Sequence, residues 1–196
     1  QTRANLTEAA AVFGSLGASV SPVEMTLDLE EVRHAVRTHI ATMFGGVLAQ
    51  SLQEYRDLMT SYAIAFSEDM AAPTVDYCRA LEIENEVCSR IAAVFEEHDV
   101  LIAPVFGLAE LAAGAEEYDH EMLFRHGLTL IFNMCSRYPV LVLPCGRSLN
   151  GVPVGVQIVG RTYDDVSVFR AASAFAAARP WFADSSVRPE SVGHSQ

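Results

Sequence analysis

The chain contains no lysine. All 13 of its basic side chains are arginines, 25 residues are acidic, and the net charge is −12. A chain this acidic repels phosphate backbones and anionic lipids, so we expect neither nucleic acid nor a membrane as a partner. No uncharged apolar run reaches the roughly 18 residues of a membrane-spanning helix. The start of the sequence also lacks the pattern of a secretory signal peptide, so we expect a cytoplasmic protein.

Metal-binding and disulfide patterns are missing as well. The four cysteines include no C-x-x-C pair, and no histidine stands at zinc-finger spacing from them. This pattern predicts buried, reduced thiols. The acidic side chains of Glu82, Glu84 and Glu86 diverge on a helix, so we interpret them as a solvated face and not as metal ligands. We therefore expect no metal and no cofactor.

Helical patterns alternate with short apolar runs along the chain. Helices are expected over 6–16, 29–43, 47–66, 75–98, 121–135 and 164–176. Strands are expected over 18–23, 100–103, 140–143 and 152–159. The alternation favours an α/β fold with a mixed β-sheet flanked by helices.

Three local signals refine this expectation. Gly45 and Gly46 should break or kink the helical pattern, and Asn150-Gly151 predicts a hairpin with a type I′ turn. Residues 107–120 have no clear period and are expected to form a loop or a poorly defined helix. We expect one domain over 1–184 and a polar tail over 185–196.

The last third of the chain carries the most specific motif. Residues 132–146 combine an asparagine, a short loop, a proline, an apolar strand and Pro-Cys-Gly. Residues 151–160 continue it as Gly-x-Pro-x-Gly-x-Gln-x-x-Gly, and an acidic pair follows at 164–165. This block resembles the C-terminal signature of amidase signature enzymes, and residues 95–104 are similar to a further element of that family. The resemblance extends from about Ala9 to Trp181.

The resemblance implies an α/β fold and hydrolysis or transfer at carboxylic amides. The family's nucleophile is a serine, activated through a second serine by a lysine, and backbone N–H groups form the oxyanion hole. This chain has no lysine and no Gly/Ser-rich nucleophile loop, and we interpret Ser15 as structural. A histidine base, His120 or His126, has no supporting spacing. We therefore assign no catalytic residue here, and expect an N-terminal portion to supply the two serines and the lysine.

The resemblance also indicates part of a substrate pocket. His126, Thr129 and Asn133 lie on a segment that comes near the substrate in the family, so they are candidate pocket residues. The alternative is a helix whose polar groups cap or pack locally. Near this site, Gln157 is expected to hydrogen-bond a neighbouring backbone. Glycines at two positions, Gly146 and Gly155, are expected at close-packing or turn positions.

Three functions are compatible with this sequence. The first is the C-terminal portion of an amidase that acts on a small amide, completing the sheet and part of the pocket. The second is a non-catalytic subunit or binding module, and the third is an amidotransferase A-type subunit. In such A subunits an arginine of the long helix meets a substrate carboxylate, whereas Glu84 aligns there, which favours neutral or aryl amides. The oligomeric state stays open, with a homodimer as one option.

Overall fold

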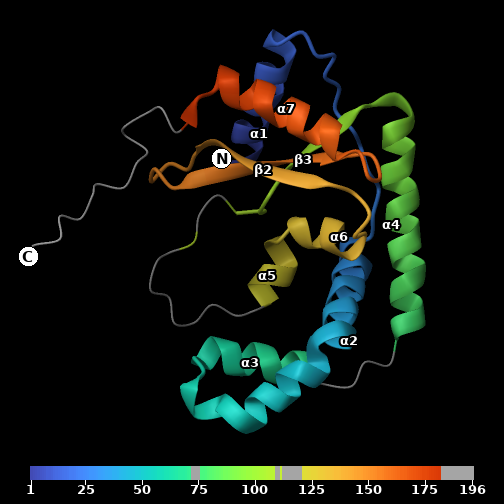
Figure 1. The fold of residues 1–196 in the computed structure, drawn as a ribbon, viewed down its shortest axis with the longest axis vertical. Coiled ribbons are helices and arrows are strands. Elements are labelled where there is room, and N and C mark those ends of the chain that lie inside the picture. Colours follow the sequence, from blue (N-terminus) through green and yellow to red (C-terminus); the bar gives the residue numbers. More distant parts are fainter. Residues whose placement is uncertain (72–75, 109–110, 112–120, 182–196) are drawn as a thin grey trace, which may run out of the picture.

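The computed structural model describes the chain except residues 72–75, 109–110, 112–120 and 182–196. Within the described residues, helices cover both faces of a small β-sheet (Figure 1). The expected tail over 185–196 and most of the expected loop over 107–120 lie outside the described residues. The α/β fold that the sequence predicts is confirmed.

The sheet consists of β1 (Val100–Pro104), β2 (Val140–Arg147) and β3 (Pro153–Gly160) in the order β1-β3-β2. Both pairings are antiparallel, and a register shift lies between Pro144 and Gly146 of β2. Because side chains alternate along a strand, each apolar run sends residues to both faces, and both faces are covered by helices. The parallel neighbours that would make the sheet mixed are not among the described strands.

One face of the sheet packs against α1 (Thr2–Ser15) and α7 (Asp165–Ala178). Val156 and Ile158 of β3 are fully buried there. Phe13 of α1 stacks on Phe175 of α7, with ring centroids 5.2 Å apart. The start of α7 is fixed by Asp164, whose side chain accepts a hydrogen bond from a backbone N–H one turn later. The first residue of the acidic pair at 164–165 therefore caps this helix.

The other face of the sheet packs against α2 (Leu29–Tyr55), α4 (Tyr77–Glu97) and α6 (Thr129–Met134). The helix predicted over 75–98 forms as α4, and its apolar side is buried in one cluster with Val159 of β3. Tyr138 ties the loop before β2 to α4, because its hydroxyl donates to the carbonyl oxygen of Cys88 at 3.0 Å. Asp76 stands at the cap position of α4.

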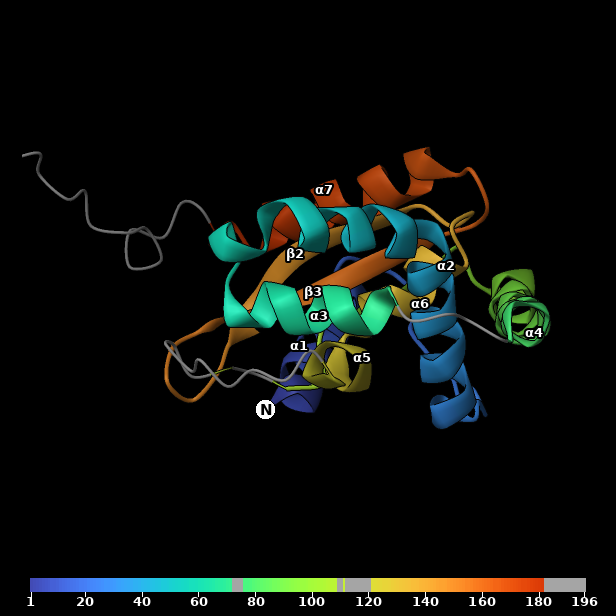
Figure 2. The ribbon, with the colours of Figure 1, turned by 90° about the horizontal axis from the view of Figure 1, so that it is seen from below.

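Helix α2 runs continuously through its two glycines and changes direction partway along (Figures 1 and 2). The predicted kink is confirmed, whereas the predicted continuation to residue 66 is wrong. A 3-10 turn at Arg56–Leu58 ends the helix, and α3 (Ser61–Met70) folds back on it. A Cβ atom on Gly45 would lie 2.7 Å from the carbonyl oxygen of Met70, so only glycine allows this close approach of the two helices.

Two predicted elements differ from the structure. Residues 18–23 form no strand: the segment runs beside α1 and β1 but pairs with no described strand, and Pro22 lacks the N–H that a ladder needs. The helix expected over 121–135 is split into α5 (Glu121–His126) and α6. Gly127 separates them, because it forms a β-bridge with Phe106.

The hairpin between β2 and β3 forms where it was predicted, but its turn is different. Gly151 has a φ of 84°, whereas Asn150 has no positive φ, so the turn is not type I′. The N–H of Gly151 donates to the carbonyl oxygen of Ser148 at 3.1 Å, and the N–H of Val152 donates to the Ser148 hydroxyl at 3.1 Å. A three-residue loop that ends in a left-handed glycine therefore replaces the two-residue turn.

Candidate functional site

The three candidate pocket residues lie on α5 and α6 but do not converge on one point. His126 ends α5, with its ring 6.0 Å from the ring of Phe106, and its carbonyl oxygen accepts from the N–H of Gly107 at 2.8 Å. Thr129 begins α6, and Asn133 follows one turn later on the same side of that helix. Among the three, Asn133 lines the cavity described next.

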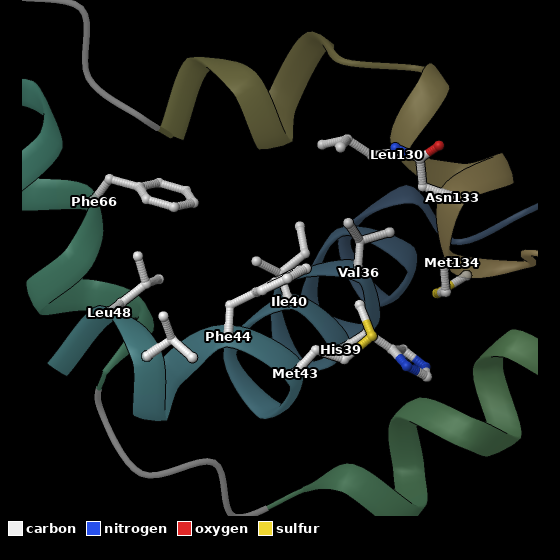
Figure 3. A pocket seen from close by; sticks show the side chains of 11 residues that line it. Val36, His39, Ile40, Met43, Phe44, Leu48, Phe66, Leu130, Asn133 and Met134 are labelled. Carbon is white, nitrogen blue, oxygen red and sulfur yellow. The ribbon is translucent and has the colours of Figure 1, made fainter. Parts of the chain in front are cut away.

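A cavity of about 490 Å³ lies between α2, α3 and α6 (Figure 3). Helix α2 supplies most of its wall, including Val36, Ile40 and Phe44. Figure 3 shows Phe66 of α3 pointing toward α2, opposite the side chains that α6 contributes. A volume of this size falls in the usual range for small-molecule sites, about 300–1,000 Å³.

One end of the cavity is polar. His39 of α2 lines the cavity, and its Nε2 atom lies 3.3 Å from Oε2 of Glu84 on α4. That nitrogen is fully buried and has no hydrogen-bond partner, so the two side chains are in close contact without a hydrogen bond. The His39 ring meets Tyr77 edge-on at 5.4 Å, and Arg137 approaches the other Glu84 oxygen at 4.0 Å.

The expectation that Glu84 belongs to a solvated face is wrong. Its side chain is 14% exposed, compared with 68% for Glu82 and 54% for Glu86. The three carboxylates diverge as predicted, but α2 covers the side of α4 that carries the middle one. Spacing alone could not reveal this, because the contact joins two helices 45 residues apart in sequence, at positions 39 and 84.

The helices around the cavity are held together by Arg37. Its guanidinium contacts the carboxylates of Asp69 in α3 and Glu121 in α5. It also lies over the ring of Phe124, 5.3 Å from the centroid, in a cation–π contact. One partly buried arginine therefore connects three helices, and sequence patterns within a single helix gave no sign of it.

Gln157 lies at the centre of β3 and is fully buried. Its Nε2 atom donates to the carbonyl oxygen of Pro104 at the end of β1, at 2.8 Å. Both glycines near this site are closely packed. A Cβ atom added to Gly155 would lie 2.9 Å from Cγ2 of Val105, and one added to Gly146 would lie 2.8 Å from Oδ1 of Asn5. These three positions serve the packing of the sheet.

Three of the four cysteines are buried, whereas Cys78 is exposed, so the expectation of uniformly buried thiols is wrong for that residue. Burial raises the pKa of Cys135, and a hydrogen bond with the adjacent Cys88 thiol raises it further. Burial also raises the pKa of Cys145. In the described part of the chain, no three His, Cys, Asp or Glu side chains are grouped as metal ligands. No described helix has the length and apolarity to cross a membrane.

Solved structures with this fold include amidases. The chain superposes on a bacterial aryl acylamidase of the amidase signature family with a TM-score of 0.73 and 23% identity, over 93% of this chain and 41% of that one. A second amidase gives a TM-score of 0.70 and 25% identity, over 90% of this chain and 41% of the other. A component of a vestigial protein complex related to an s-triazine catabolic enzyme superposes with a TM-score of 0.71 and 22% identity, over 91% of this chain and 39% of that one.

Sequence relatives include glutamyl-tRNA(Gln) amidotransferase A subunits. The subunit from Cyanothece sp. is 32% identical over 105 residues, which is 54% of this chain and 22% of the relative. The subunit from Syntrophomonas wolfei is 27% identical over 167 residues, or 80% of this chain and 33% of the relative. The chain thus spans only a fraction of the length of these relatives. The amidase family profile matches residues 4–169, and the chain belongs to the amidase family.

Proposed function

We propose that this chain is the C-terminal portion of an amidase that hydrolyses the C–N bond of a small carboxylic amide. The family match over residues 4–169 carries the proposal. In the proposed reaction, a serine that is activated through a second serine by a lysine attacks the amide carbonyl, the amine leaves, and water releases the acid. Because the chain has no lysine, that base belongs to an N-terminal portion.

The role of this chain is to complete the sheet and to form part of the pocket. Apolar side chains that a finished core would cover are exposed on β2, where Val140 is 37% and Val142 is 49% exposed. We infer that the N-terminal portion, on the same polypeptide or on a second one, packs on this surface of β2.

Two other functions of the same family have some support. The sequence relatives are named as amidotransferase A subunits, which favours transfer of ammonia over simple hydrolysis. The likeness to a component of a vestigial protein complex is compatible with a subunit of a larger assembly, and a non-catalytic subunit is the second alternative. Glu84, facing His39 near the cavity, weighs against an anionic substrate and therefore against the first of these. We place the protein in the cytoplasm and leave a homodimer as one option.

The test is hydrolysis by the protein joined to the portion encoded immediately upstream. Release of 4-nitroaniline from 4-nitroacetanilide, or of ammonia from benzamide, is expected from the joined protein and not from this chain alone. Replacement of the upstream lysine by alanine should abolish that release. Glutamine-dependent amidation of glutamyl-tRNA would instead identify an A-type subunit. If the two portions associate stably but catalyse neither reaction, the chain is a non-catalytic subunit.

A further inference from the structure

We propose that the cavity between α2, α3 and α6 binds an uncharged aryl group of the amide substrate, and that the His39–Glu84 pair excludes a carboxylate from it. This inference rests on the proposed function, since it names the substrate class of that amidase. It assigns specificity to side chains on α2, α3, α4 and α6, and among them only Asn133 lies within the family motif.

The walls of the cavity fit an aromatic ring. They are apolar except at His39 and Asn133, and Phe44 and Phe66 offer ring faces and edges to a planar group. Burial of an aromatic ring removes a large apolar area from water, and ring–ring contacts add to the gain. Asn133 offers the cavity an amide that can both donate and accept a hydrogen bond, so one uncharged polar substituent would also be satisfied.

The charges around the cavity exclude an anion. None of the described side chains that line it is an arginine, so a substrate carboxylate would lose its water without gaining a guanidinium partner. The Glu84 carboxylate behind His39 adds repulsion at short range and in a poorly hydrated setting. Arg137 offsets this only in part, because its side chain is 55% exposed and lies 4.0 Å from the far oxygen of Glu84.

The test uses the joined protein and two substrate pairs that differ by one carboxylate. Acetanilide with 4-acetamidobenzoate places the ring on the amine side, and benzamide with 4-carbamoylbenzoate places it on the acyl side. We expect Glu84→Gln to raise kcat/KM for the carboxylated member relative to the neutral one by about tenfold in one pair. The pair that responds identifies which side of the amide enters the cavity. The matched control is Glu86→Gln on the exposed face of α4, which should leave both ratios within about twofold.

A second variant tests the cavity by its volume. Ile40→Trp fills it and should lower kcat/KM for the neutral aryl substrate by about tenfold or more. The control is Val166→Trp, at a position that is 59% exposed on α7, across the sheet. Thermal denaturation of each variant shows whether it is folded. If Ile40→Trp is unfolded, Glu84→Gln still tests the proposal, because this substitution conserves the volume of the side chain.

The outcomes separate this inference from the proposed function. If the joined protein hydrolyses amides but neither variant changes a substrate ratio, the inference is wrong and the amidase function stands. Ile40→Trp could instead weaken the association of the two portions and leave the substrate ratios unchanged. The N-terminal portion would then fill the cavity, and this result would also overturn the inference. If no amide is hydrolysed, calorimetric binding of acetophenone that Ile40→Trp abolishes would support the cavity while the amidase function fails.

Discussion

Two neighbouring glycines of α2 are expected to respond in opposite ways to the same substitution. Alanine in a helix interior is favoured over glycine by about 0.5–1 kcal/mol, because glycine loses more backbone entropy on folding. A Cβ atom on Gly46 would meet no heavy atom within 4 Å. Gly46→Ala should therefore raise the free energy of unfolding by about 0.5–1 kcal/mol.

At Gly45 the same methyl group meets backbone. Its Cβ atom would lie 2.7 Å from the carbonyl oxygen of Met70, the last residue of α3. A backbone oxygen cannot rotate aside as a side chain can, so α2 and α3 must separate. Overpacking of this kind costs about 1–3 kcal/mol. After the helix-propensity gain is subtracted, Gly45→Ala should lower the free energy of unfolding by about 1–2 kcal/mol.

Urea denaturation followed by circular dichroism measures both effects. If unfolding is two-state, the midpoints of the two variants should move in opposite directions from wild type with unchanged slopes. Because the two glycines are adjacent in one helix, composition and helix propensity are matched between the variants. A stabilising Gly45→Ala would refute the close packing of α3 on α2, and with it this wall of the cavity.

Three further outcomes are expected. Phe175→Ala removes a ring that is 1% exposed and stacked in the core, and should lower the free energy of unfolding by about 3–5 kcal/mol in the same urea assay. Hydrogen bonds from the side chain and backbone of Ser167 lower the pKa of Asp164 below its ordinary 3.8. Its stabilising effect is therefore complete above pH 3.8 and is lost as the pH falls through the folded-state pKa, so the stability of Asp164→Asn should vary less with pH in acid. Iodoacetamide at pH 8 should modify exposed Cys78 well before Cys135, whose pKa burial raises; equal rates in peptide mass spectrometry would contradict the buried site.

Local sequence patterns predicted the elements that depend on local physics. The helix predicted over 75–98, the strand predicted over 100–103 and the helix predicted over 164–176 each reflect side-chain periodicity or a hydrogen bond within a few residues. The family motif likewise marked the hairpin and the segment that holds Asn133. These features need no knowledge of the tertiary fold, which is why they could be predicted.

The errors lie where distant segments meet. Gly127 splits a predicted helix because Phe106 pairs with it, and residues 18–23 lack a described strand to pair with. The cavity could not be predicted from the sequence for the same reason. Its polar end joins His39 of α2 to Glu84 of α4, and these residues are far apart in the chain. An apolar or acidic residue on a helix does not reveal which other helix will cover it.

We propose that this chain supplies walls of an amidase site and not its nucleophile. Treatment of the joined protein with a fluorophosphonate, which captures activated serines, followed by peptide mass spectrometry, tests this most directly. We expect a single modified serine in the upstream portion, with labelling lost when the upstream lysine is replaced. Specific labelling of a serine within this chain would contradict the claim.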